Sequence, residues 1–206
     1  MKTIIFDMDG TLLNSEKAIC ESINHMRKWL GMSELSSEFI VEVINDMSKN
    51  SIVEFYGTDK IDANLRAEFE RVYVENYKKF AVLYEGILEL LQKCKKAGFF
   101  IAMASNAPTQ TLDGILKMTG VREFFDFVIG ADDKIPQKPD PKMLFEVLKN
   151  SEFKKAIFLG DSNKDEFAAK NANISYLQVI WGMGKFSKTA TNAKTPDEAW
   201  EIISKL

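Results

Sequence analysis

Apolar and polar positions follow two different periods along the chain, and the change of period predicts where strands and helices lie. The compact apolar run Thr3–Phe6 predicts a first strand, and the acidic, glycine-containing run Asp7–Gly10 predicts a turn directly after it. Between Ser15 and Phe80 no further strand-like run occurs, and the apolar residues between Leu65 and Phe80 follow helical spacing. Residues 15–80 are therefore expected to form a helix-only insert.

Beyond this insert, helix-like and strand-like segments alternate. A helix over Ile87–Ala97, stopped by Gly98, precedes a buried strand over Phe99–Ala104. The same order then repeats with helices over Thr109–Met118, Pro141–Leu148 and Lys164–Ala172, strands over Phe127–Ile129, Ala156–Leu159 and Tyr176–Ile180, and a closing helix over Pro196–Lys205. Such alternation is typical of a parallel sheet with right-handed crossovers.

The expected fold is therefore α/β, with a Rossmann-like parallel sheet core flanked by helices and an inserted all-helical cap domain. Residues 1–14 and 81–206 should form the core, and residues 15–80 the cap. The length of 206 residues lets the chain bury a substantial core, either as one domain or as a core with a small inserted domain.

Composition and charge narrow the classes of partner. The chain is 46% hydrophobic and 28% charged with a net charge of −3, and its basic residues are scattered among acidic ones. No basic stripe indicates a nucleic-acid backbone or an anionic membrane, and no apolar run reaches spanning length. We expect a soluble cytoplasmic protein, monomeric or homodimeric, whose partner is a small molecule. Cys20 and Cys94 fall in helix-like segments and should be reduced thiols packed as small apolar groups.

Polar residues capable of chemistry follow the predicted strands. In chain order these residues are Asp7, Asp9, Ser105, Asn106, Lys138, Asp161 and Asp165. In an open parallel sheet, ligands bind in the crevice outside the carboxyl ends of the strands. Segments that are distant in sequence are therefore expected to deliver these side chains to one pocket.

These residues also carry a family resemblance. The run Phe6–Leu12 resembles the signature loop of the haloacid dehalogenase superfamily, and Ser105-Asn106, Lys138-Pro139 and Gly160–Ser162 with Asp165 are similar to its other three motifs in the same order. The resemblance covers essentially the whole chain, including a helical cap after the first strand. It is nearest to the branch that contains phosphoglycolate phosphatases and β-phosphoglucomutases. It implies a Mg²⁺-dependent phosphatase acting on a small phosphorylated metabolite.

The chemistry of such a reaction explains why acids and a lysine should converge. A carboxylate that attacks a phosphate dianion about 3.5 Å away meets a repulsion of roughly 9 kcal/mol at an effective dielectric near 20, so cations are needed. The predicted Mg²⁺ ligands are Asp7, Asp161 and the backbone carbonyl of Asp9, with Asp165 bracing them from outside. The predicted phosphate-binding groups are the ammonium of Lys138, the hydroxyl of Ser105 and the donors around Asn106.

The resemblance further implies that two carboxylates divide the reaction. Asp7 attacks phosphorus and forms an aspartyl-phosphate, while Asp9 protonates the leaving oxygen and later activates water. Thr11 is expected to orient Asp9. Dehalogenases and ion-pumping ATPases of the superfamily lack an acid at the position of Asp9, so its presence favours phosphoester hydrolysis.

Each motif also has a purely structural reading. Asp-Gly after a strand is a common turn, and Asp161 and Asp165 could be a helix N-cap and a first-turn acid. Four segments in the right order, each at the end of a strand, favour the functional reading. His25 is interpreted as structural or exposed, because the proposed chemistry does not require a histidine.

Substrate choice should come from the cap, where the sequence allows more than one interpretation. The loop Asn45–Ser51 lacks a glycine-proline pattern associated with phosphoglycolate phosphatases. Its Ser48-Lys49 and Ser51-Ile52 pairs resemble serine-arginine and serine-leucine pairs of β-phosphoglucomutases, and Lys49 is a candidate specificity residue; a polar surface turn explains the same residues. A phosphosugar mutase and a non-enzymatic phospho-accepting receiver remain as alternatives to the phosphatase.

Overall fold

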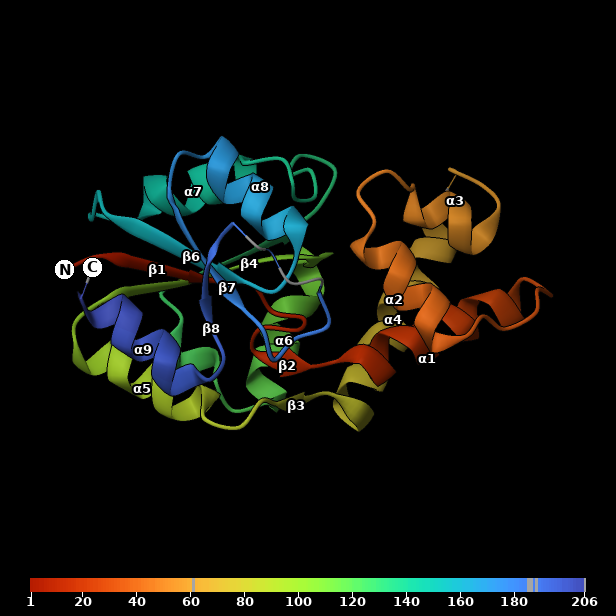
Figure 1. The fold of residues 1–206 in the computed structure, drawn as a ribbon. Coiled ribbons are helices and arrows are strands. Elements are labelled where there is room, and N and C mark those ends of the chain that lie inside the picture. The colour runs from red at the N-terminus through yellow and green to blue at the C-terminus, as the bar shows by residue number, and fades with distance from the viewer. Residues whose placement is uncertain (61, 185–186, 188, 206) are drawn as a thin grey trace. The chain divides into compact units, whose positions relative to one another are not determined.

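Six strands form one parallel sheet over the residues that the computed structural model describes, which are 1–60, 62–184, 187 and 189–205 (Figure 1). The order across the sheet is β5-β4-β1-β6-β7-β8. Their bounds are β1 Thr3–Phe6, β4 Phe100–Pro108, β5 Phe127–Ala131, β6 Ala156–Gly160, β7 Ser175–Val179 and β8 Thr191–Ala193.

The register of the central strands brings their carboxyl ends to one level. In β1 every residue is buried, and Phe6 pairs in parallel with Met103 of β4 and Leu159 of β6. The residues that follow these three positions must therefore emerge at the same edge of the sheet. Asp7 is the first of them, because it comes directly after Phe6.

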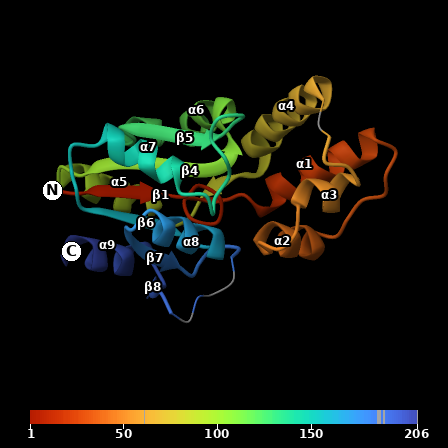
Figure 2. The same cartoon turned by 90° about the horizontal axis from the view of Figure 1, so that it is seen from above.

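Helices cover both faces of the sheet. In Figures 1 and 2, α7 (Lys142–Asn150) and α8 (Asn163–Asn171) lie on one face, whereas α5 (Ile87–Lys96) and α9 (Pro196–Lys205) lie on the other. Helix α6 (Thr109–Met118) packs against β4 and β5. The apolar core beneath α7 and α8 includes Ile5, Ala102, Met143, Leu144, Phe158 and Ala168. Burial of apolar surface is the dominant favourable term in folding, so this layer stabilises the sheet.

The chain divides into two compact units. The core unit is Met1–Asn14 with Leu83–Leu206, and the insert is Ser15–Val82. The connections between them, β2 (Leu13–Asn14) and β3 (Val82–Leu83), pair as a two-stranded sheet.

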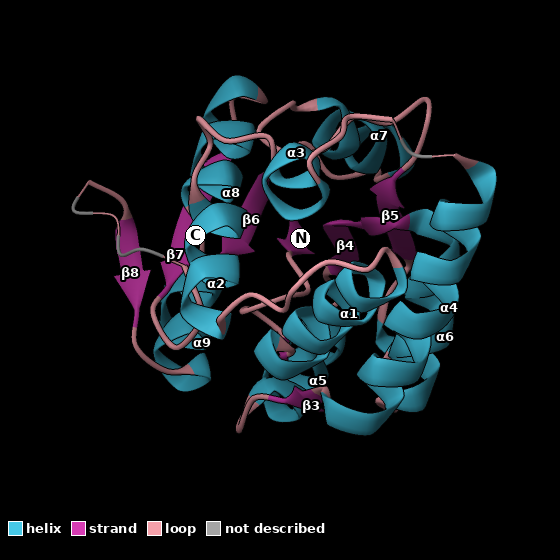
Figure 3. Ribbon diagram, turned by 90° about the vertical axis from the view of Figure 1, so that its right-hand side faces the viewer, coloured by secondary structure: helices cyan, strands magenta, loops and turns pink. Residues whose placement is uncertain are grey.

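The insert consists of α1 (Glu16–Trp29), α2 (Ser37–Asn45), α3 (Ser51–Tyr56) and α4 (Ala63–Phe80), joined by loops (Figure 3). Ser36, Asn50 and Asp62 begin α2, α3 and α4 as N-caps whose side chains accept backbone N–H bonds. A small core packs these helices together, formed by Cys20, Ile23, Ile40, Val43 and Phe55.

The predicted fold class is confirmed: a parallel sheet flanked by helices carries a helical insert after the first strand. Cys20 and Cys94 are buried free thiols, as expected. The prediction missed β8 and the short 3₁₀ helix Arg122–Phe124, because neither has a long enough apolar period to be recognised. In the described part of the chain, no helix combines the length and apolar character that crossing a membrane requires.

Candidate active site

The turn after β1 is held by backbone hydrogen bonds at both ends. The Asp7 N–H donates to Leu159 O (2.8 Å), so β1 and β6 stay paired as far as the candidate nucleophile. The Gly10 N–H donates to Leu13 O (2.9 Å), which closes the turn. Gly10 has φ +76°, and a β-carbon there would overlap the Asp161 carboxylate. Only glycine lets the turn approach Asp161 this closely.

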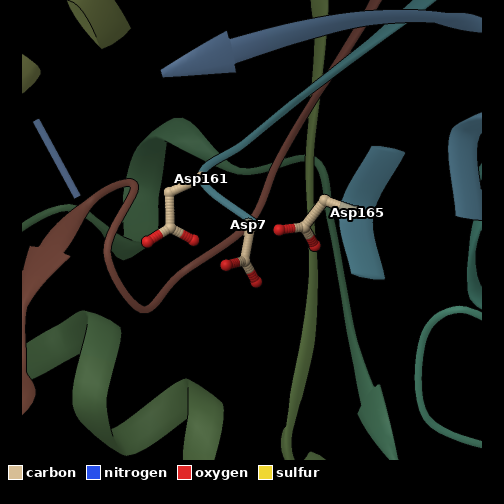
Figure 4. Close-up of side chains that lie close together, drawn as sticks. All are labelled: Asp7, Asp161 and Asp165. Atoms are coloured by element: carbon tan, nitrogen blue, oxygen red, sulfur yellow. The ribbon is translucent and has the colours of Figure 1, made fainter. Parts of the chain in front are cut away.

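Three buried carboxylates meet at the carboxyl edge of the sheet. Oxygens of Asp7, Asp161 and Asp165 all lie within 4.8 Å of one another, and Figure 4 shows their carboxylate groups close together. Asp161 follows β6 directly, and Asp165 lies in the first turn of α8. Asp165 Oδ2 accepts hydrogen bonds from the backbone N–H and the hydroxyl of Ser162 (3.1 and 2.6 Å), which fixes its side chain.

Lys138 brings a buried positive charge to these carboxylates. Its Nζ lies 2.5 Å from Asp7 Oδ1 and 2.7 Å from Asp165 Oδ1, and it donates to the Ala104 carbonyl (2.9 Å). The lysine comes from the loop between β5 and α7, and only 3% of its surface is exposed. A residue far away in sequence is thus fixed beside the candidate nucleophile, as the sequence motifs predict.

Burial, together with the neighbouring carboxylates, raises the pKa values of Asp7 and Asp161. Burial raises the pKa of Asp7 well above its ordinary value; Lys138 opposes this shift, and Asp165 and Asp161 reinforce it. Burial, followed by the charge of Asp165, raises the pKa of Asp161 to about 7. Burial alone would lower the pKa of Lys138, but the charges of Asp165 and Asp7 outweigh it and raise that pKa. One ammonium does not neutralise three buried carboxylates.

This cluster fits a divalent cation. Buried carboxylate oxygens are hard ligands of the kind that such ions prefer, and a cation would offset the repulsion between the three carboxylates. The carboxylate oxygens that converge belong to Asp7, Asp161 and Asp165, so Asp165, which was predicted as a brace, lies beside the two predicted carboxylate ligands. Asp9 lies half-buried in the turn after β1, and its predicted carbonyl ligand stays a prediction.

Two of the candidate phosphate-binding residues, Ser105 and Asn106, lie inside a strand rather than in a loop after it. Ser105 and Asn106 were expected to follow the strand, but they lie inside β4, which continues to Pro108. The reason is a register shift between Ala104 and Pro108, after which β4 pairs with β5 again at Ala131. The irregular stretch still places both residues at the carboxyl edge of the sheet.

Asn106 has a bracing contact that the motif alone does not reveal. Its Oδ1 accepts from the Lys138 N–H (2.7 Å), and its Nδ2 donates to the Lys138 carbonyl (3.2 Å). Ser105 Oγ accepts from the Ala107 N–H (3.1 Å), so the hydroxyl hydrogen can be directed elsewhere. Asn106 therefore holds the loop that carries Lys138, and the Ser105 hydroxyl can still donate to a ligand.

Three other residues singled out in the sequence are Thr11, Lys49 and His25. Among the described residues the buried Thr11 hydroxyl has no hydrogen-bond partner, and its predicted role in orienting Asp9 stays a prediction. In the insert, Lys49 Nζ forms an ion pair with Glu42 (3.2 Å). His25 is half-exposed and lies 3.3 Å from Glu68, in agreement with its interpretation as a structural or exposed residue.

Sequence reasoning missed the support that β7 and the segment after it give to Asp161. Gln178 Nε2 donates to the Asp161 carbonyl (2.6 Å), and the backbone N–H groups of Met183 and Gly184 donate to Asp161 Oδ2 (2.7 and 2.8 Å). A glutamine in the predicted strand Tyr176–Ile180, followed by two glycines, was the available signal. Its target could not be inferred without the fold.

Comparison with known proteins agrees with this site. The haloacid dehalogenase-like hydrolase family matches residues 4–179. A phosphoglycolate phosphatase from Aquifex aeolicus is 29% identical over 199 residues, covering 96% of this chain and 91% of the relative. One from Psychrobacter arcticus is 31% identical over 192 residues, covering 87% and 83%. The structure of a haloacid dehalogenase-like family hydrolase from Streptococcus pneumoniae is similar in fold, with a TM-score of 0.78 and 22% identity, covering 98% of this chain and 97% of that one.

The chain belongs to the haloacid dehalogenase-like hydrolase family. Within it, the chain falls in the phosphoglycolate phosphatase-like branch that carries a helical cap, and it is an enzyme of the phosphatase type. The family assignment also removes the support for a non-enzymatic receiver.

Proposed function

We propose that this enzyme hydrolyses a small phosphorylated metabolite through an aspartyl-phosphate on Asp7. The observation that carries the proposal is the contact of Asp7 Oδ1 with Lys138 Nζ (2.5 Å) inside a cluster of three buried carboxylates. An isolated buried carboxylate is a poor nucleophile toward an anion, because both charges repel. A lysine and a divalent cation beside it would remove that obstacle.

In the proposed reaction, an Asp7 oxygen forms a bond to phosphorus while the bond from phosphorus to the substrate oxygen breaks. Asp9 gives its proton to the departing oxygen. In the second step Asp9 takes a proton from water, whose oxygen attacks phosphorus and releases inorganic phosphate with Asp7 restored. Asp9 follows Asp7 by two positions in the same turn, which supports this division of roles.

The remaining polar groups would bind the phosphoryl oxygens. Lys138 supplies a charge that Asn106 holds in place through two hydrogen bonds to its backbone. The Ser105 hydroxyl adds a donor from β4. These groups are fixed by the fold before a substrate arrives, which is the arrangement that stabilises a charged transition state most effectively.

We assign Mg²⁺ as the cation, held by Asp7 and Asp161, with Asp165 as a brace or a further ligand. When bound, Mg²⁺ would neutralise charge on the phosphoryl group and orient it. In the described structure Asp165 also forms an ion pair with Lys138 (2.7 Å), which supports the role of a brace shared by the two cationic groups.

We propose that residues 1–14 and 81–206 act as the catalytic core and that the helices of residues 15–80 act as a cap that selects the substrate. The names of the relatives from A. aeolicus and P. arcticus make 2-phosphoglycolate the first compound to test, with sugar phosphates second. Lys49 stays a predicted specificity residue. The cytoplasmic location and the monomeric or homodimeric state also stay predictions.

The proposal is tested by measuring inorganic phosphate release from a panel of phosphorylated metabolites, with Mg²⁺ and with excess chelator. We expect phosphate release with Mg²⁺, and a loss of at least about 10²-fold in chelator that added Mg²⁺ restores, because the carboxylate cluster lacks enough positive charge without it. Full activity in excess chelator would contradict the metal assignment. Isomer formation without phosphate release would instead identify a phosphosugar mutase.

A further inference from the structure

We propose that the segment Trp181–Gly184, which follows β7, is a positioning element that aims the carboxylate of Asp161 at the metal ion and ties it to the turn carrying Asp7 and Asp9. The inference rests on the proposed function, because it concerns the cation that the carboxylate cluster would hold. Neither the sequence motifs nor the family match, which ends at residue 179, assigns this segment a role.

The first contact fixes one oxygen of Asp161. Its Oδ2 accepts hydrogen bonds from the backbone N–H groups of Met183 (2.7 Å) and Gly184 (2.8 Å). No hydrogen bond from a described residue reaches its Oδ1. Two N–H donors on a single oxygen set the rotation of the carboxylate and stabilise its charged form. The other oxygen remains available as a ligand.

The second contact joins the same segment to the turn after β1. Trp181 Nε1 donates to the Thr11 carbonyl (3.0 Å). Gly182 lies against the Gly10 carbonyl and the Asp161 side chain so closely that a β-carbon there would come within 2.6 Å of Asp161 Cβ. A residue larger than glycine therefore does not fit at position 182. The segment contacts both Asp161 and the turn after β1.

A third set of contacts joins strand β7 to the backbone at Asp161. The buried Gln178 donates to the Asp161 carbonyl (2.6 Å), and the Tyr176 hydroxyl lies 2.9 Å from Gly160 O and 3.2 Å from Ser162 O. Strand β7 therefore holds the backbone on both sides of Asp161, while Trp181–Gly184 holds its side chain. Hydrogen-bond partners that orient a metal ligand typically contribute 10-fold to 100-fold to metal affinity.

The test compares the affinity of the wild type and of two variants for Mg²⁺ alone, measured by isothermal titration calorimetry. Gly182→Ala places a methyl group between Asp161 and the turn, and Trp181→Phe removes the indole N–H but keeps a ring. Gly114→Ala is the matched control, because a β-carbon at Gly114 in α6 meets nothing within 4 Å. We expect the dissociation constant to rise by at least about 10-fold for Gly182→Ala, by a smaller factor for Trp181→Phe, and not at all for the control.

Melting temperatures in chelator separate positioning from general destabilisation. The inference requires weaker Mg²⁺ binding in a variant whose metal-free melting temperature stays near that of the wild type. A Gly182→Ala protein that folds and binds Mg²⁺ within about threefold of the wild type would overturn it. If Gly182→Ala does not fold, Trp181→Phe decides: a dissociation constant more than about threefold above that of the wild type supports the inference, and a smaller change overturns it. A wild type that does not bind Mg²⁺ would contradict the proposed metal site itself, whereas unchanged binding in the variants contradicts only the role of this segment.

Discussion

The Asp7→Asn variant should lose at least about 10⁴-fold in kcat while remaining folded, because an amide cannot attack phosphorus in place of the carboxylate. Asn has nearly the same shape as Asp, and its Oδ1 can still accept the hydrogen bond that Lys138 donates to Asp7 Oδ1. The substitution also removes one of three mutually repelling buried carboxylates. The metal-free variant should therefore be at least as resistant to thermal unfolding as the wild type.

This combination distinguishes a chemical loss from a structural one. The control is Asp197→Asn, since the Asp197 side chain is 83% exposed on α9 and lies 2.7 Å from Lys93 in an ion pair of the surface kind that contributes little. We expect the control to retain full kcat, measured as phosphate release on the best substrate. A turnover rate in Asp7→Asn within about 10-fold of the wild type would contradict nucleophilic attack by Asp7.

The Lys138→Met variant should lose at least about 10³-fold in kcat/KM, because methionine fills a similar volume without the charge that offsets repulsion between Asp7 and the phosphate. Lys138 Nζ is the contact shared by Asp7 and Asp165. Lys149→Met in the last turn of α7 is the control, with a side chain that is 77% exposed, and it should leave kcat/KM unchanged. An equal effect of both substitutions would contradict the role assigned to Lys138.

The same substitution should destabilise the metal-free protein in a pH-dependent way. Without the ammonium, burial keeps the pKa of Asp7 above its ordinary value with nothing to oppose it. A carboxyl whose pKa is raised by folding binds more protons in the folded state, so stability is present at low pH and is lost as pH rises. We expect the free energy of unfolding to fall by about 3 kcal/mol relative to the wild type near pH 8, and by less near pH 5. Denaturant titrations at the two pH values measure this difference.

The period of the apolar residues predicted most of the fold, because each buried strand and each amphipathic helix leaves a local pattern. Thr3–Phe6 and Thr109–Met118 have the predicted bounds in the structure. Strand β4 runs four residues beyond its predicted end, since its continuation depends on pairing with β5 across a register shift. Pairing with a distant strand is a tertiary property that no local window contains.

The site was predictable where the chemistry requires particular side chains, and it was not predictable where backbone groups make the contacts. Asp7, Lys138 and Asp161 were identified because acids and a lysine after strands are chemically distinctive, and the fold brings them together. The N–H donors of Met183 and Gly184 were not, because every residue except proline offers the same backbone group. Only three-dimensional placement shows which backbone groups meet a ligand.

The covalent intermediate on Asp7 is the central claim, and acid-quenched single-turnover labelling tests it most directly. Wild-type enzyme is mixed with a ³²P-labelled substrate and Mg²⁺ and quenched in acid within one turnover, and the quenched protein is divided into two samples. We predict that the first sample retains ³²P on the protein. In the second sample, borohydride should release the labelled phosphate and convert Asp7 to homoserine, which mass spectrometry of the digested protein detects; Asp7→Asn should acquire neither the label nor the homoserine. Turnover without any phosphoenzyme, or phosphate attached to another residue, would contradict the account.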